Sequence, residues 1–301
     1  MASPTKYRFL LVERSEDGVE VLTLNRPERM NACNGPMLVE LREHFEALRY
    51  DLAVRVVLLR GAGKGFCTGM DMKEGAGMDQ PKKQAPAGEP AAPKKPRPRP
   101  SVYAGNHAWS DVVRKMRACP QPIIALVHGY AMGGGFAIAL GADIRLAAAG
   151  TKFNVQMIRI GMSGGDVGIS YALPRAVGQS VAAELMLTGD FISAERGARV
   201  GLVSEVYADM PDMLQAAEAM AKRMVLANPD GLRFTKECLR LSVDAPSLEA
   251  AMAVEDRQQM LMAHLSSEHR SRVTDFAHHK ETDAASASIF HDKPANPASK
   301  L

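Results

Sequence analysis

The chain has 301 residues, of which 46% are hydrophobic, so it is long enough and apolar enough to bury a sizeable core in one large domain or two smaller ones. Its 37 lysines and arginines slightly exceed its 34 aspartates and glutamates, which gives a formal charge of +3. Intrinsic disorder of a whole chain requires low hydrophobicity and a high net charge, so this composition excludes it. Aromatic residues make up only 5%, so stacking platforms for bases are scarce and nucleic-acid binding is not expected.

The four cysteines lie far apart and form neither a CxxC pair nor a Cys/His cluster, so we expect no disulfide framework and no metal site. The N-terminus lacks the basic and apolar regions of an export signal, which favours a reducing cytoplasm. The apolar stretch 123–142 approaches the length of a membrane span. Its glycines and His128 favour a buried strand followed by a buried helix, so no membrane association is expected.

The first sixty residues predict a strand hairpin, a helix and a third strand. Apolar runs at 9–12 and 19–24 flank a glycine turn, as in a hairpin. Asn34 resembles the N-cap of a helix whose apolar residues repeat at helical spacing up to Arg49. The β-branched run 54–59 predicts the third strand, which ends at a glycine loop.

Residues 79–100 differ in composition from everything around them. Seven prolines and six lysines or arginines fall between Pro81 and Pro100 with a single acid, Glu89. Almost nothing there can join a core, so we expect an exposed, disordered insertion. Without residues 81–100 the chain has 31 basic and 33 acidic side chains, so the folded body is slightly acidic.

A second strand-to-helix unit follows this insertion. Residues 122–127 predict a buried strand, 134–141 a helix, and 144–149 another strand. The alternation predicts a layered α/β core with right-handed crossovers. From about Pro211 the pattern becomes continuously helical and leads to a polar tail after about Glu281.

Two glycine-rich segments are candidates for chemistry. The run Gly133-Gly134-Gly135 opens a helix, where free backbone N–H groups and the helix dipole favour an oxyanion. The alternative is that these glycines only allow tight packing of helix against strand. The segment 161–165 matches the GxSxG pattern of serine hydrolases around Ser163, with Asp190 and His264 or His269 as nominal partners; the alternative is that these histidines lie on a solvated helix face.

Several motifs in order resemble the enoyl-CoA hydratase/isomerase (crotonase) superfamily over about residues 9–207, with a looser similarity to about 280. They are LNRP at 24–27 with Asn31 and Ala32, GFCTGMD at 65–71, HGYAMGGG at 128–135, ADIR at 142–145, LPRAVG at 173–178 and GLV at 201–203. The resemblance implies an α/β fold, with a crotonase-like ββα spiral core over residues 1–207, interrupted by the insertion, and a C-terminal helical trimerisation region over 208–301. It also implies an acyl-CoA substrate, no cofactor beyond the coenzyme A of that substrate, and a homo-oligomer that is a trimer or a dimer of trimers.

In that family two backbone N–H groups polarise the thioester carbonyl and stabilise the enolate that forms. The resemblance assigns these groups to Met70 and Gly134. Hydratases of the family add water with two glutamates. Ala137 and Met157 occupy the matching positions in this sequence. Neither side chain transfers a proton, so hydration by paired glutamates is not expected.

One carboxylate remains at a matching position, that of Asp166. It resembles the acid/base aspartate of dienoyl-CoA isomerases and the nucleophilic aspartate of aryl-CoA dehalogenases. The alternative is that Asp166 is the N-cap of a helix beginning at Val167.

The resemblance places further residues along the substrate: Asn31, Ala32, Lys64, Gly69, Asp71, Gly133 and Phe276. Lys64 pairs with a phosphate of coenzyme A or is a solvated loop lysine. The basic insertion borders the pocket mouth and attracts the same phosphates, or is only a solubilising segment.

We therefore expect an enzyme that acts on an enoyl-CoA through an enolate, by double-bond isomerisation or an atypical hydration in which Asp166 moves the proton. One alternative is a non-catalytic acyl-CoA-binding protein that keeps the oxyanion pocket. The other is a serine hydrolase that uses Ser163.

Overall fold

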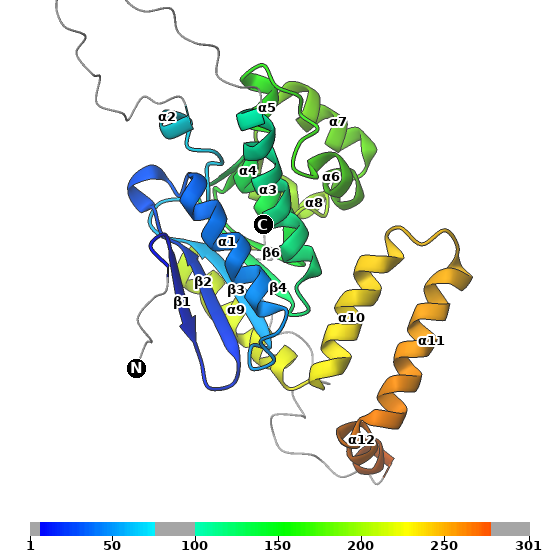
Figure 1. Cartoon of the computed structure of the whole chain (residues 1–301). Coiled ribbons are helices and arrows are strands. Elements are labelled where there is room, and N and C mark those ends of the chain that lie inside the picture. The colour runs from blue at the N-terminus through cyan, green and yellow to red at the C-terminus, as the bar shows by residue number, and fades with distance from the viewer. Residues whose placement is uncertain (1–6, 76–99, 278–301) are drawn as a thin grey trace, which may run out of the picture.

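The computed structural model describes residues 7–75 and 100–277, and its centre is a six-stranded sheet in the order β1-β2-β3-β4-β6-β9 (Figure 1). The first pair of strands is antiparallel and the following pairs are parallel. The strands are β1 (Leu10–Arg14), β2 (Val19–Leu24), β3 (Val56–Gly61), β4 (Ile123–Val127), β6 (Ile144–Ala148) and β9 (Glu205–Tyr207).

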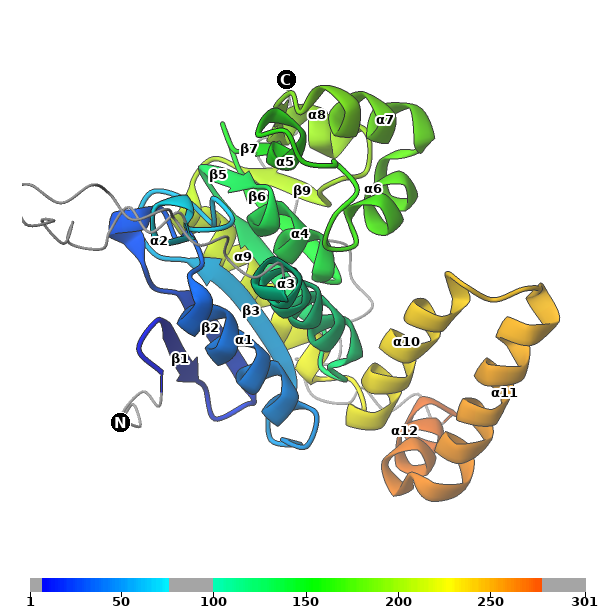
Figure 2. The same ribbon diagram turned by 45° about the horizontal axis from the view of Figure 1, so that its top comes forward.

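Side chains of this sheet alternate between two helical layers, with the period of two that a strand imposes. Val57 and Leu59 of β3 face the core that α1 and α3 cover, whereas Val56 and Leu58 face α9. Figure 2 shows α1 and α3 on one side of the sheet and α9 on the other. These helices are α1 (Gly35–Leu48), α3 (Pro100–Ala118) and α9 (Met210–Val225).

A second, smaller sheet consists of β5 (Tyr130–Met132), β7 (Lys152–Asn154) and β8 (Ile192–Ser193). β4 of the large sheet leads into β5 of the small one and then into a helix, and β6 leads into β7 and a helix in the same way. This repeat is the ββα spiral that the resemblance implies. The short helices of this region are α4 (Gly134–Gly141), α5 (Gln156–Arg159), α6 (Ile169–Val177), α7 (Gln179–Thr188) and α8 (Ala194–Arg199).

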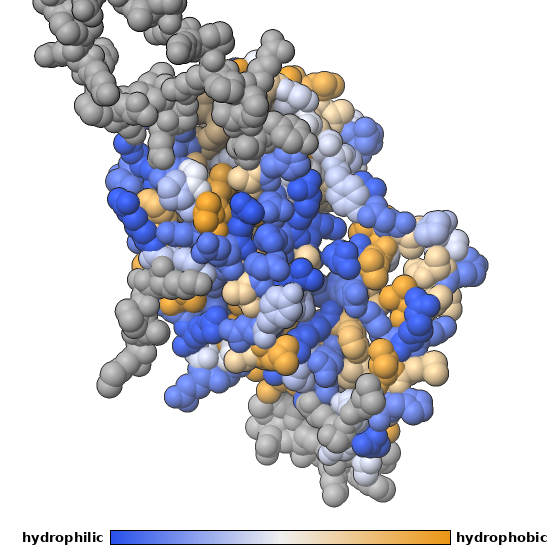
Figure 3. All heavy atoms as spheres, in the orientation of Figure 1, coloured by the Kyte–Doolittle hydropathy of each residue, from blue (hydrophilic) through white to orange (hydrophobic). Residues whose placement is uncertain are grey.

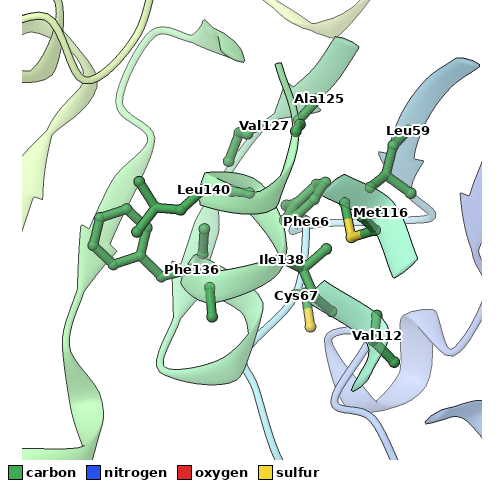
Figure 4. Close-up of a cluster of buried hydrophobic side chains, with 14 of the residues drawn as sticks. Leu59, Phe66, Cys67, Val112, Met116, Ala125, Val127, Phe136, Ile138 and Leu140 are labelled. Carbon is green, nitrogen blue, oxygen red and sulfur yellow. The ribbon is translucent and has the colours of Figure 1, made fainter. Parts of the chain in front are cut away.

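The helix α4 lies at the centre of the molecule, and its residues 135–141 are all buried. Figure 4 shows Phe136, Ile138 and Leu140 of this helix among side chains from several other elements. A helix that is apolar all round belongs in a core, and its position there fixes where its N-terminus lies. That N-terminus is the triple-glycine run.

The last helices form an arm that stands apart from the sheet (Figures 1 and 2). They are α10 (Pro229–Ser242), α11 (Leu248–Leu265) and α12 (Ser267–Ala277). Lys236 of α10 is buried against the body, where its Nζ lies 2.8 Å from Asp143 Oδ2 and donates to the Gln121 carbonyl at 2.8 Å. This contact anchors the arm.

The structure confirms the hairpin, the third strand, the strands predicted at 122–127 and 144–149 as β4 and β6, the helix over 134–141 and the helical last third. Asn34 is the N-cap of α1, since its side chain accepts a hydrogen bond from the Met37 N–H. The insertion falls outside the described residues except for Pro100, the first residue of α3; the polar tail lies beyond them. Within the described ranges, no helix combines the length and apolarity needed to cross a membrane.

Candidate active site

The segment 66–70 is held beside β5 by backbone hydrogen bonds. The Cys67 N–H donates to the Tyr130 carbonyl and the Met132 N–H donates to the Cys67 carbonyl, both at 3.0 Å. At Gly69, whose φ is +88°, an added Cβ would lie 2.8 Å from the Met132 oxygen and 3.1 Å from the Gly134 nitrogen. Only glycine tolerates this approach and this backbone angle, so the segment ending in Met70 lies against the start of α4.

The N–H groups of Met70 and Gly134 therefore lie on neighbouring segments. Gly134 is the first residue of α4, so its N–H has no acceptor within the helix, and the helix dipole adds partial positive charge there. Within residues 7–75 and 100–277, neither N–H donates to another group. Two such donors at a helix N-terminus form an arrangement suited to an oxyanion.

The triple glycine is also required for packing. A Cβ on Gly134 would lie 2.5 Å from the ring of Trp109, and one on Gly135 would lie 2.1 Å from the Cys67 carbonyl oxygen. Gly133 has a φ of +52°, and its N–H donates to the Asn154 carbonyl at 3.0 Å. The packing role and the N–H without an acceptor thus occur in the same turn.

Apolar side chains hold the positions at which hydratases of the family carry glutamates. Ala137 is buried one turn into α4, and Met157 of α5 is buried beside the glycine turn, with its sulfur 3.4 Å from the site of a Cβ on Gly133. Neither position supplies a proton-transferring group.

Asp166 is half-buried in the loop between α5 and α6. Its Oδ1 accepts a hydrogen bond from the N–H of Val167 at 2.8 Å. Val167 has a φ of +50°, a strained angle for a β-branched residue, of the kind that clusters at functional sites. The N-cap alternative for Asp166 is wrong, because α6 begins at Ile169 and its N-cap is Gly168, which has no side chain to bond.

A cavity of about 190 Å³ lies between α3, α4 and the start of α6. Its lining includes Ala137 together with Val167 and Gly168, the two residues that follow Asp166. The loop that carries Asp166 and the position of the missing glutamate therefore border one space. That space begins one turn along α4 from Gly134.

A buried polar network supports the loops around this site. Arg26 Nη2 lies 2.9 Å from Asp71 Oδ2, and Arg26 also donates to the Ala32 carbonyl. Asn31 is completely buried, and its Nδ2 donates to the Ala62 and Gly65 carbonyls at 2.8 Å. In this structure these side chains hold the loop that leads to Met70. The sequence motifs at 24–27 and 65–71 contain Arg26 and Asp71 but do not indicate that their side chains form an ion pair.

The remaining candidates occupy other places. Lys64 is exposed in the glycine loop after β3, and Phe276 lies in α12 with its side chain outside the described residues. Ser163 is exposed and its Oγ accepts from the Gly165 N–H at 3.1 Å. The helix α5, not a strand, precedes it, whereas a nucleophile elbow needs a strand leading into the serine. His264 contacts the Met260 carbonyl of its own helix.

His128 follows β4 and lies between the two sheets. Its Nε2 lies 3.0 Å from the Gly63 carbonyl oxygen. Burial lowers the pKa of His128, and the hydrogen bond to Gly63 opposes that shift. The side chain contacts the glycine loop that precedes the segment 66–70, so its role in this structure is to position that loop.

Comparisons with known proteins bear on the family and the fold of this chain. Residues 19–292 match the family model described as enoyl-CoA hydratase/isomerase. The chain is 39% identical over 267 residues to a protein of Mycobacterium bovis named a probable enoyl-CoA hydratase, covering 88% of each. It is 34% identical to the human mitochondrial Delta(3,5)-Delta(2,4)-dienoyl-CoA isomerase, covering 79% of this chain and 70% of that protein.

A solved structure of an enoyl-CoA hydratase from Mycobacterium smegmatis has the same fold. The TM-score is 0.78 at 30% sequence identity, covering 92% of this chain and 98% of that one. The family match extends over most of the sequence, and the relatives include both hydratases and isomerases. The chain is therefore an enzyme of the enoyl-CoA hydratase/isomerase family, with the crotonase fold.

Proposed function

We propose that the enzyme shifts a carbon–carbon double bond of an enoyl-CoA, or hydrates it atypically, through an enolate. The Met70 and Gly134 N–H groups bind the thioester oxygen, and Asp166 moves the proton. The observation that carries the proposal is the pair of N–H groups without acceptors next to a cavity that borders the Asp166 loop. We propose no cofactor beyond the coenzyme A of the substrate.

The isomerisation needs one carboxylate that acts twice. Asp166 removes a proton from a carbon next to the double bond, and the electrons move onto the thioester oxygen, where the two N–H groups stabilise the negative charge. Asp166 then returns the proton to another carbon of the same conjugated system. Direct addition of water by two glutamates lacks both carboxylates here, since Ala137 and Met157 stand in their places. The similarity to a protein named as a dienoyl-CoA isomerase favours the double-bond shift.

Replacing Asp166 tests this assignment directly. In Asp166→Asn the amide cannot accept the proton, so we expect kcat on a panel of enoyl-CoA and dienoyl-CoA esters to fall by about 10²- to 10⁴-fold while KM changes little. Turnover would be followed by the absorbance of the conjugated thioester and by product identification.

The matched control is Ser163→Ala in the same exposed loop, and we expect this variant to keep full activity. We expect a fluorophosphonate to label neither the variant nor the wild-type protein. A wild-type enzyme inactive on the whole panel, or an Asp166→Asn variant as active as wild type, would remove Asp166 from the mechanism. Labelling that Ser163→Ala abolishes would favour the serine hydrolase instead.

We also propose that the chain assembles as a homotrimer or as a dimer of trimers. Large apolar side chains are exposed on the helical arm, among them Leu239 (65% exposed), Leu248 (70%) and Met260 (62%). Figure 3 shows hydrophobic residues over this arm. Exposed apolar side chains gathered on one element are typical of protein–protein interfaces.

A further inference from the structure

Two arginines line the same cavity as Ala137. They are Arg114 and Arg117, which lie one turn apart on α3. Arg117 is half-buried, and its guanidinium carbon lies 5.4 Å from the centroid of the Tyr171 ring. Within the part of the chain that the structure describes, no carboxylate pairs with Arg117. Arg114 approaches Asp111 only at 4.0 Å, and that carboxylate is held by Arg42 at 2.9 Å.

A neighbouring arginine, Arg175, has a carboxylate near its guanidinium. Arg175 stacks on the same Tyr171 ring at 3.9 Å, but it does not line the cavity. Asp244 lies 3.9 Å from Arg175 and accepts a hydrogen bond from the Tyr171 hydroxyl at 2.8 Å. The Asp244 carboxylate thus lies near Arg175, and an excess of positive charge remains on the cavity side of the Tyr171 ring.

The two arginines lie at the end of the cavity remote from the oxyanion N–H groups. Trp109 of α3 contacts Gly134, and Val113 lies 3.5 Å from the site of a Cβ on Gly141, so α3 runs along α4. Arg117 is eight residues beyond Trp109, roughly 12 Å along the helix at about 1.5 Å per residue. The Arg117 guanidinium lies there beside the Tyr171 ring of α6.

Between these two ends the cavity wall is apolar apart from Ser110 of α3. It includes Leu140 of α4, Val167 of the Asp166 loop, and Ile169 and Ala172 of α6. An acyl chain whose thioester carbonyl binds at Gly134 passes Ala137 and this wall before it meets the arginines. The arrangement has a polar anchor at each end and hydrocarbon contacts between them.

We propose that the acyl group of the substrate carries a second carboxylate at its far end, which Arg117 and Arg114 bind. The proposal rests on the proposed acyl-CoA function, because the direction of the chain follows from the thioester at Gly134. A half-buried guanidinium loses hydration that only a hydrogen-bonded anion replaces well. The planar fork of arginine binds a carboxylate through two parallel hydrogen bonds, which a methyl terminus cannot offer.

The test compares saturated CoA esters that differ only in the terminal group: succinyl-, glutaryl- and adipyl-CoA against butyryl-, pentanoyl- and hexanoyl-CoA. None has a double bond, so calorimetry measures binding without turnover. We expect wild type to bind at least one dicarboxylyl ester about tenfold or more tightly than its neutral counterpart. We expect Arg117→Met to abolish this difference and to change the affinity for the neutral ester by no more than about twofold.

Arg175→Met is the matched control, since Arg175 contacts the same ring outside the cavity, and it should keep the preference. Arg117→Gln serves as a second variant if Arg117→Met does not fold by circular dichroism. The proposal is overturned if wild type shows no preference for any dicarboxylyl ester, if Arg117→Met weakens both kinds of ester equally, or if Arg175→Met has the same effect as Arg117→Met.

These outcomes are separate from those of the Asp166 experiment. A carboxylate preference in a protein that turns over no enoyl-CoA would support this inference and reject the proposed reaction. Turnover that depends on Asp166 without any carboxylate preference would do the reverse.

Discussion

At Gly134 the absence of a side chain allows the packing of α3 against α4, and under the proposed function it also gives the substrate access to a backbone N–H. The Trp109 ring occupies the space that a Cβ would need, at 2.5 Å. The N–H of the same residue is the first of α4 and has no helical acceptor. Under the proposed function, we therefore expect a change at this residue to affect stability and catalysis together.

We predict that Gly134→Ala lowers kcat by about 10²- to 10³-fold, because moving the glycine away from Trp109 displaces the oxyanion donor. Overpacking against the ring should also cost about 1–3 kcal/mol in the free energy of unfolding. Gly35→Ala is the control, since a Cβ there meets open space at the start of α1. It should keep wild-type kcat and be neutral or stabilising by up to about 1 kcal/mol. Wild-type kcat in Gly134→Ala would show that the packing of Trp109 against Gly134 does not set the position of this N–H for catalysis.

At the scale of elements, the arm of α10 to α12 is attached to the body through a buried cation on α10 and through exposed contacts, such as the hydrogen bond that Asp244 accepts from the Tyr171 hydroxyl. Lys236 enters the body from α10 and meets the Asp143 carboxylate and the Gln121 carbonyl. The Asp143 carboxylate also accepts from the Ile123 N–H at 2.7 Å, where β4 begins. The arm is thus tied to the end of a central strand.

We predict that Lys236→Met destabilises the protein by about 1–3 kcal/mol, because it removes the cation beside the Asp143 carboxylate and the Lys236 donor to the Gln121 carbonyl. Hydrogen exchange of the α10 amides should accelerate more than that of α1. The control is Arg240→Met on the exposed side of α10, whose ion pair with Glu237 is 4.0 Å long, with an expected effect below about 0.5 kcal/mol. Equal exchange of α10 in Lys236→Met and wild type would show that other contacts hold the arm.

Elements with a helical repeat or a continuous apolar run were predictable, whereas the short strands and the helix α3 were not predicted. Strands β3 and β4 have continuous apolar runs, and α1 has a helical repeat with Asn34 as its cap, so local sequence identifies them. Strands β5, β7, β8 and β9 have two or three residues each, too few for a period to appear. They form because adjacent strands of the same molecule supply their hydrogen bonds.

At the scale of the whole molecule, the two cores leave the arm with apolar surface that nothing in the described chain covers. The cores lie on the two sides of the large sheet and draw on α1, α3, α4 and α9. Leu239, Leu248 and Met260 of the arm are more than half exposed. Burial of such side chains against other copies of the chain would stabilise an oligomer.

We predict that Leu239→Glu lowers the molar mass measured by light scattering after gel filtration, because a charge cannot enter a packed interface without a partner. Leu52→Glu is the control: Leu52 is also 63% exposed but lies in the loop before β3, and its variant should keep the mass of wild type. A wild-type protein that is already monomeric, or a Leu239→Glu variant with unchanged mass, would contradict this assignment of the interface.

By itself the sequence determined the alternation of strands and helices, the family resemblance, the glycine turn and the loss of the two glutamates, because each is a matter of local period, motif or residue identity. Only the tertiary structure decided that the Met70 and Gly134 N–H groups lie on adjacent segments, that Arg26 pairs with Asp71, and that Asp166 does not cap α6. It also decided that Arg117 shares a cavity with Ala137. Those relations join residues far apart in the chain, and packing, not spacing, brings them into contact.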